Sequence, residues 1–148
     1  MDNGFAESEG MRNLKYLLGI DLGTSGTKTV LFEETGRAVA SETIEYPLYQ
    51  PKNGWAEQEP EDWWNAARDT VKAVMTKSGV NPGDVKGVGI SGQMHGLVLL
   101  DEEGRVLRRS ILWCDGRTQE ECDEITETIG RERLIEISAN PALTGFTA

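Results

Sequence analysis

Three short runs rich in apolar and β-branched residues occupy the first third of the chain. Residues 15–22 (KYLLGIDL) are mostly apolar, residues 28–33 (KTVLFE) are rich in strand formers, and residues 38–46 (AVASETIEY) alternate. Turn-forming residues at 23–27 and 34–37 separate the runs. A parallel return needs a crossover of about a dozen residues or more, so this spacing predicts three neighbouring antiparallel strands.

A helix is predicted after a loop at 47–59 that contains two prolines. Pro60 suits the first helical turn, the two acidic residues after it favour the positive end of the helix dipole, and Gly79 ends the helix. We interpret Trp63 and Trp64 as packing residues rather than as a binding site. The apolar stripe of this helix is formed by Trp64, Ala67, Val71, Val74 and Met75.

Shorter elements are expected in the rest of the chain. Residues 85–91 (VKGVGIS) predict a buried strand, parallel to the first because a full helix precedes it. Residues 97–107 predict a hairpin around Asp-Glu-Glu-Gly, and residues 110–113 (SILW) begin a further short strand. An acidic helix with a solvated face is expected at 118–129, and a short helix at 132–137. This order of elements predicts an α/β domain with a mixed sheet.

Composition narrows the classes of function. The net charge is -10 and the sequence pI is near 4.6, whereas nucleic acids and anionic membranes are bound through basic surfaces. No apolar stretch approaches the roughly 20 residues that a membrane span needs. We therefore expect neither nucleic acid nor a membrane as a partner. Cys114 and Cys122 lack zinc-site spacing and are interpreted as reduced thiols of a cytoplasmic protein.

The two ends of the chain differ from its middle. Residues 1–10 (MDNGFAESEG) are polar and acidic and lack the apolar core of a secretory signal. We predict that residues 1–14 are a disordered N-terminal extension, and that residues 15–148 form one unit. The final segment, NPALTGFTA, contains neither a cap nor a charge cluster. We therefore expect the chain to be a fragment that stops inside its domain.

The turn within residues 19–28 (GIDLGTSGTK) is the first candidate for chemistry. A Walker A loop needs glycine before the lysine, where this chain has Thr27, and a dinucleotide fingerprint leads into a helix rather than a strand. Two interpretations remain open. In one, backbone N–H groups and hydroxyls of the turn bind phosphate, and Asp21 holds the water shell of a magnesium ion. In the other, the segment is a plain hairpin that Asp21 caps.

Four motifs, in order along the chain, carry a family resemblance. They are Asp-x-Gly-Thr-Ser at 21–25, GWAEQEPEDWW at 54–64, ISGQMHGLVLLD at 90–101 and ILWCDGR at 111–117. Together they resemble the carbohydrate kinase family of the actin-like ATPase superfamily, which includes glycerol kinase and xylulokinase. The resemblance covers nearly all of the chain after Lys15. It implies an actin-like, ribonuclease H-like fold, of which this chain is an incomplete first lobe, the N-terminal part of the sugar-binding lobe.

The resemblance also implies ATP and Mg²⁺ as cofactors. Asp21 would meet the metal. The residues that would meet the ATP phosphates are Gly23, Thr24, Ser25, Gly26, Thr27 and Lys28. Lys28 also fits a position that points along the second strand rather than into a cleft.

Gln-Met-His-Gly resembles the substrate loop of the xylulokinases in this family, whereas glycerol kinases carry an Arg-Glu pair there. The resemblance implies D-xylulose as substrate and D-xylulose 5-phosphate as product. The implied substrate contacts are Met94, His95, Gly96, Trp113, Asp115 and Arg117. A core role for Trp113 and a surface ion pair of Asp115 with Arg117 remain as alternatives.

His95, the only histidine, is interpreted as a residue that orients the substrate and not as a general base. In the family the base is an aspartate, which we expect beyond Ala148, so the chain carries no expected catalytic residue and is predicted to be inactive alone. The other implied partners are the C-terminal remainder of the enzyme and, for the full-length enzyme, a second copy in a homodimer. A kinase for another sugar or polyol, and a non-catalytic sugar-binding module, are the alternative functions.

Overall fold

A mixed sheet of four strands organises the computed structural model, which describes residues 15–147. β1 (Tyr16–Leu22), β2 (Gly26–Glu33) and β3 (Ala38–Glu45) are antiparallel neighbours, and β5 (Val85–Gly92) pairs in parallel with β1. The order across the sheet is β3-β2-β1-β5. The predicted mixed sheet, with three antiparallel strands first, is confirmed.

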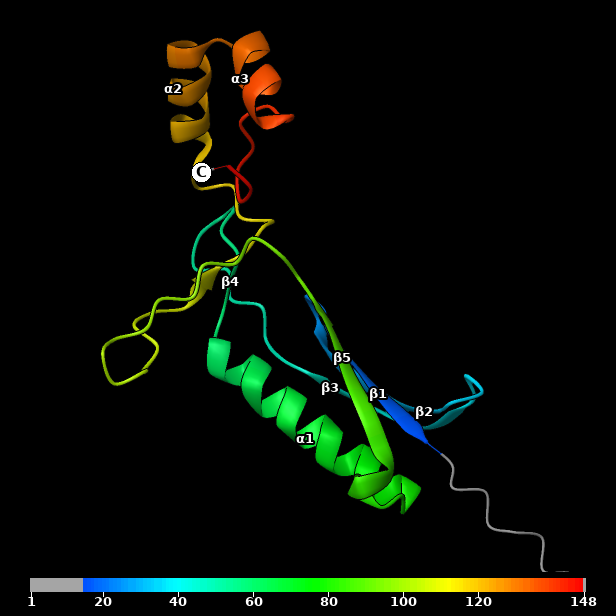
Figure 1. Ribbon diagram of the computed structural model, residues 1–148. Coiled ribbons are helices and arrows are strands. Elements are labelled where there is room, and N and C mark those ends of the chain that lie inside the picture. Colours follow the sequence, from blue (N-terminus) through cyan, green and yellow to red (C-terminus); the bar gives the residue numbers. More distant parts are fainter. Residues whose placement is uncertain (1–14, 148) are drawn as a thin grey trace, which may run out of the picture.

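One helix covers one face of this sheet. α1 (Pro60–Ser78) runs beneath the strands in Figure 1 and packs mainly on β2 and β3. It begins with its proline and ends at Gly79, whose φ of 65° lies in the left-handed region that favours glycine. Val74 of α1 packs with Leu18 and Leu31 in the main apolar cluster. The predicted helix is confirmed.

The two tryptophans near the start of α1 lie in different environments. Trp63 is half-buried, and its indole N–H donates to Gln58 Oε1 at 3.0 Å. Trp64 is 65% exposed, so the prediction that it is a packing residue is wrong within the described residues. It lines a shallow apolar groove between α1 and the sheet together with Ile20 and Ile90.

Strand β5 is more open than its apolar sequence predicts. It follows a short 3₁₀ helix, η1 (Pro82–Asp84), and only β1 pairs with it in the described part of the chain. Val88 and Ile90 of β5 are 60% and 72% exposed. The prediction of a buried strand is therefore wrong in its burial and right in its parallel direction.

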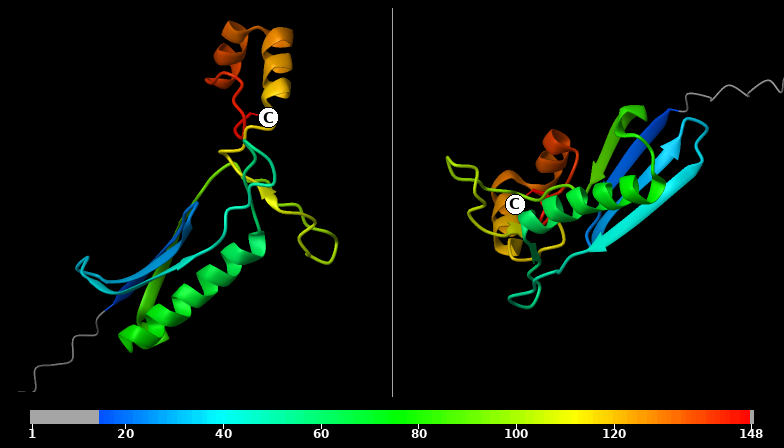
Figure 2. Two further views of the ribbon diagram at one scale, coloured as in Figure 1. Left: turned by 180° about the vertical axis from the view of Figure 1, so that it is seen from behind. Right: turned by 90° about the horizontal axis from the view of Figure 1, so that it is seen from below.

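A smaller set of elements lies beyond the end of the sheet. β4 (Glu57–Gln58) and β6 (Ser110–Ile111) form a two-stranded antiparallel ribbon. α2 (Gln119–Ile129) and α3 (Arg131–Ser138) contact each other and stand apart from the large sheet (Figure 2). Both helices were predicted within one residue of these bounds at each end, and most of α2 is exposed as expected.

The segment between β5 and β6 forms the predicted hairpin with a single bridge, between Leu100 and Val106. Asp101 closes its turn by accepting the N–H of Arg105 at 2.8 Å. None of the helices in the described residues combines the length and apolar character needed to cross a membrane. The extension predicted at 1–14 lies outside the described residues.

Candidate functional site

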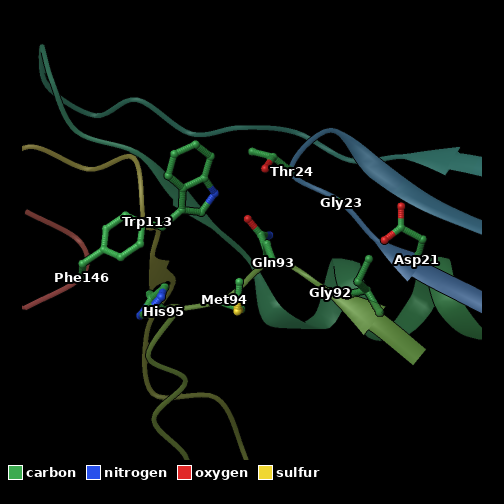
Figure 3. Close-up of a pocket in the computed structure, with 10 residues that line it drawn as sticks. Asp21, Gly23, Thr24, Gly92, Gln93, Met94, His95, Trp113 and Phe146 are labelled. Carbon is green, nitrogen blue, oxygen red and sulfur yellow. The ribbon is translucent and has the colours of Figure 1, made fainter. Parts of the chain in front are cut away.

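An open cleft of about 340 Å³ lies where β1 and β5 end (Figure 3). Because these strands are parallel, their carboxyl ends meet at one edge of the sheet, where open α/β sheets bind ligands. Three of the four motifs contribute to the lining. The lining residues are Asp21, Leu22, Gly23, Thr24, Gly92, Gln93, Met94, His95, Trp113 and Phe146.

The turn predicted to bind phosphate is shorter than the sequence predicts. β2 already begins at Gly26, which leaves residues 23–25 as the turn. A Cβ on Gly26 would stand 2.7 Å from Ile44 O, so this glycine serves the close approach of β3. Thr27 is fully buried and belongs to the strand, so the prediction that its hydroxyl converges in the turn is wrong. The candidate hydroxyls are reduced to the two at positions 24 and 25, and Ser25 lies outside the residues that line the cleft.

Tyr46, which lies outside the motif at 21–25, makes two hydrogen bonds to the turn at 23–25. Its hydroxyl donates to Gly23 O, and its N–H donates to Ser25 O at 3.4 Å. Burial, together with the nearby charge of Asp21, raises the pKa of the Tyr46 hydroxyl above its ordinary value. Sequence reasoning missed Tyr46, because it stands at the end of an alternating strand with no motif around it.

Asp21 and Lys28 are register partners on β1 and β2. Asp21 is exposed and borders the cleft, whereas Lys28 borders a separate hollow with Asp21, Val30 and Ser91 and does not line the cleft. The described residues contain no group of three or more His, Cys, Asp or Glu that could hold a metal ion. A single carboxylate fits Mg²⁺, which often uses one or two carboxylates with water and substrate phosphates.

The loop after β5 presents two of its three predicted residues, Met94 and His95, to the cleft. Met94 is 71% exposed, and His95 has a φ of 63°, which is uncommon for a residue other than glycine. Trp113 lines the cleft and is 40% exposed, so the alternative core role is wrong. Gly96 does not line the cleft. A Cβ on Gly96 would lie 3.1 Å from Ser110 Oγ. Its small size therefore serves packing of the loop on β6.

Phe146 completes an aromatic wall that the sequence did not predict. Its ring centroid lies 4.4 Å from that of His95 and 6.5 Å from that of Trp113 (Figure 3). The preceding Gly145 has a φ of 70°, and a Cβ there would stand 2.2 Å from Trp113 O. The only sequence signal was a Gly-Phe pair in the final segment, which has no regular pattern.

Asp115 and Arg117 form a largely buried cluster with Glu57. Arg117 Nη2 lies 2.8 Å from Asp115 Oδ2 and 2.8 Å from Glu57 Oε1, and the guanidinium stacks 3.7 Å from the centre of the Trp55 ring. Asp115 Oδ2 also accepts the N–H of Ala56 at 2.6 Å. Neither Asp115 nor Arg117 lines the cleft.

The electrostatics of this cluster favour its charged form. Burial pushes the pKa of Asp115 upward, but hydrogen bonds from Arg117 and from the Ala56 N–H outweigh burial and hold the pKa below its usual value. The hydrogen bond to Asp115 raises the pKa of Arg117. Asp115 is 2% exposed, so the alternative of a surface ion pair is wrong. Direct contact of either residue with a substrate stays a prediction.

Comparison with known proteins places the chain in a family. Residues 16–148 match the N-terminal domain of the FGGY family of carbohydrate kinases. The chain belongs to this family. The FGGY domain is 46% identical over 134 residues to the xylulose kinase of Bacillus subtilis (strain 168), covering 90% of this chain and 27% of that relative. It thus spans about a quarter of the length of the curated relatives it matches.

Solved structures of sugar kinases have the same fold as this FGGY domain. A xylulose kinase from Rhodospirillum rubrum superposes with a TM-score of 0.75 at 32% identity, over 82% of this chain and 25% of that one. A gluconate kinase from Lactobacillus acidophilus gives a TM-score of 0.75 at 32% identity, over 83% of this chain and 24% of that one. The predicted actin-like sugar kinase fold is therefore confirmed for the N-terminal domain.

Proposed function

We propose that the full-length protein transfers the terminal phosphate of ATP to D-xylulose and forms D-xylulose 5-phosphate. The observation that carries the proposal is the cleft that the turn residues Gly23 and Thr24 line together with the loop residues Met94 and His95. Membership of a carbohydrate kinase family supports it. So does the similarity to xylulose kinases from Bacillus subtilis and Escherichia coli.

The phosphate end of the proposed site is the edge formed by Asp21 and the turn. Asp21 would hold Mg²⁺ through its water shell, and the hydroxyl of Thr24, which lines the cleft, would meet phosphate oxygens. When bound, the ion would neutralise charge on the transferred phosphoryl group. Lys28 is left outside this arrangement, because it does not line the cleft.

The sugar end combines a polar group with apolar surfaces. His95 supplies ring nitrogens for sugar hydroxyls, while Met94, Trp113 and Phe146 supply faces for the carbon chain. Small-molecule sites usually pair a few placed polar groups with such apolar walls. We propose that Asp115 and Arg117 act on this end by fixing the segment that carries Trp113.

The isolated chain is proposed to be inactive. Asp21 is the sole carboxylate among the described residues that line the cleft, and it is assigned to the metal. Phosphoryl transfer depends on the positioning of both substrates and on stabilisation of the charge on the transferred phosphoryl group. We propose that the general base and the adenosine-binding lobe come from the rest of the protein. The apolar groove beside Trp64 and Ile90 offers that remainder a surface to pack on.

A substrate panel on the purified full-length protein tests the function. ATP-dependent phosphorylation is measured with D-xylulose, L-ribulose, gluconate and glycerol under the same conditions. The highest kcat/KM is expected for D-xylulose, with its 5-phosphate as product. A clear preference for another member of the panel would refute the substrate assignment, and no transfer to any of them would refute the kinase assignment.

Another sugar kinase of the family is the second candidate. The similarity to the gluconate kinase of Lactobacillus acidophilus, at 32% identity, favours keeping gluconate in the panel. The same panel separates this candidate from a sugar-binding module, which would bind a sugar without consuming ATP. Cytoplasmic location and homodimer formation by the full-length protein stay predictions.

Removal of the His95 side chain is expected to weaken sugar recognition. We expect His95→Gly in the full-length protein to raise the KM for D-xylulose about 10- to 100-fold, the effect of one or two lost hydrogen bonds in a site. The KM for ATP is expected to change less than about threefold, since His95 lies at the other end of the cleft. Glycine also relieves the positive φ of this position, so a loss cannot be assigned to backbone strain. Unchanged kinetics would assign His95 to packing against Phe146.

A further inference from the structure

Gln58 joins two segments that line the cleft, at Thr24 and Gln93, without lining it itself. It lies on β4, and its side chain is fully buried. Its Nε2 donates to Thr24 O at 2.7 Å and to Pro47 O at 3.4 Å. Its Oε1 accepts from Trp63 Nε1 at 3.0 Å and from Gln93 Nε2 at 2.9 Å. One buried amide therefore contacts the phosphate turn, helix α1 and the residue that precedes Met94.

The orientation of this amide follows from its neighbours. Backbone carbonyls can only accept hydrogen bonds and an indole N–H can only donate, so Gln58 must turn its NH₂ toward Thr24 and its oxygen toward Trp63. Gln93 must then present its own NH₂ to Gln58. The Oε1 atom of Gln93 is left buried and without a partner among the described residues. The hydrogen bond between the two glutamines therefore leaves one buried acceptor unpaired among the described residues.

The hydrogen bonds of Gln58 connect the proposed phosphate turn with the sugar loop. Thr24 belongs to the proposed phosphate turn, and Gln93 directly precedes the sugar loop residues Met94 and His95. Reacting atoms must lie about 3–3.5 Å apart, and a misplacement of about 1 Å can cost roughly 100-fold in rate. A buried hydrogen-bonded network is stiff, because breaking one of its bonds leaves a polar group unsatisfied.

We propose that Gln58 is a positioning residue that fixes the sugar loop relative to the phosphate turn. This inference rests on the proposed kinase function. Gln58 acts through Thr24 and Gln93 and touches neither substrate. Removal of the Gln58 side chain is therefore expected to lower the rate of transfer to the sugar more than the rate of ATP hydrolysis, which needs only the phosphate end.

Two variants of the full-length protein test the link kinetically. Gln58→Leu and Gln93→Leu each remove the amide bridge, and two rates are measured for each: transfer to D-xylulose, and hydrolysis of ATP in the absence of sugar. The ratio of transfer to hydrolysis is expected to fall at least about tenfold in both variants, because hydrolysis needs only the phosphate end. The double variant is expected to match Gln58→Leu, since the same bridge is broken once.

A matched control separates positioning from stability. Thr70→Val removes another fully buried hydrogen bond, between Thr70 Oγ1 and Thr29 Oγ1 at 2.7 Å, on the covered face of the sheet. This variant is expected to lose thermal stability and to keep the wild-type ratio of transfer to hydrolysis. Equal losses of both rates in Gln58→Leu would show a merely structural role and overturn the proposal.

Hydrogen exchange tests the link without any turnover. In the full-length protein, backbone amides at 23–25 and at 93–96 are expected to exchange at least about tenfold faster in Gln58→Leu than in wild type, as expected when a local restraint is removed. Gln93→Leu is expected to loosen the loop in the same way. Unchanged exchange in both segments would overturn the inference. A wild-type protein that phosphorylates no sugar would instead refute the proposed function, and the exchange result would still decide whether the bridge restrains the cleft.

Discussion

Replacement of Asp21 by asparagine is expected to lower kcat of the full-length protein about 100- to 1,000-fold, the usual effect of removing a preorganised electrostatic contact. Asp21 is exposed at the end of β1 and is the sole carboxylate among the described residues that line the cleft. Asparagine keeps the size of the side chain and removes its charge. The apparent affinity for Mg²⁺ is expected to fall with kcat. Initial rates measured across a Mg²⁺ titration at saturating ATP and D-xylulose check both expectations.

The control for Asp21→Asn is a carboxylate away from the cleft. Asp69 lies on α1 and pairs with Arg68 at 2.8 Å, so Asp69→Asn is expected to leave kcat and the Mg²⁺ dependence unchanged. The KM for D-xylulose is expected to change little in Asp21→Asn, because Met94 and His95 remain in place. A full rate with normal Mg²⁺ dependence in Asp21→Asn would leave Asp21 as a simple capping residue of the hairpin.

The strands and helices could be predicted because their causes are local. Alternation, turn residues, Pro60 and Gly79 act within a few positions of the element that they shape. Burial of β5 could not be predicted, because Val88 and Ile90 are exposed or covered according to which elements lie beside them. An apolar run has the same sequence in either situation.

The cleft could be predicted in part, for a similar reason. Asp21, Met94 and His95 belong to short motifs, and parallel pairing of β1 with β5 is enough to bring those motifs together. Gln58 and Phe146 act through partners that lie far from them in the sequence, such as Gln93 and Trp113. No local pattern marks such partners, so their roles appear only once the chain is folded.

The error at Thr27 had a different origin. The sequence predicts a turn from Gly23 to Thr27, whereas Gly26 already pairs with Glu45 in the β2–β3 register. A strand that begins two residues earlier turns the Thr27 side chain into the interior, because successive side chains point to opposite faces of a sheet. Small shifts of a boundary thus decide whether a hydroxyl belongs to a site or to the core.

The cluster of Arg117 with two buried carboxylates leads to the largest expected loss of stability. Arg117→Met would leave Asp115, which is 2% exposed, without its guanidinium partner. Glu57, which is 8% exposed, would keep only its ion pair with Arg108 at 3.0 Å. Breaking a buried pair by removing one partner costs about 3–5 kcal/mol. We expect the free energy of unfolding of the full-length protein's N-terminal domain to fall by about 3 kcal/mol, the lower end of that range, because the Arg117 side chain is 12% exposed. Urea unfolding followed by the fluorescence of the tryptophans measures this loss.

The same cluster is expected to make stability depend on acid pH. The pKa of Asp115 is lowered in the folded protein, so its contribution is present above the unfolded value of about 3.9 and is lost as the pH falls through the lower folded pKa. Asp115→Asn removes the titrating group and is expected to flatten the fall in unfolding free energy below about pH 4, at the expense of lower stability at neutral pH. Since Asp115 also fixes the N–H of Ala56 and sits two residues after Trp113, the KM for D-xylulose is expected to rise in this variant as well. An acid profile identical to that of the wild type would show that Asp115 is not held in its charged form by Arg117.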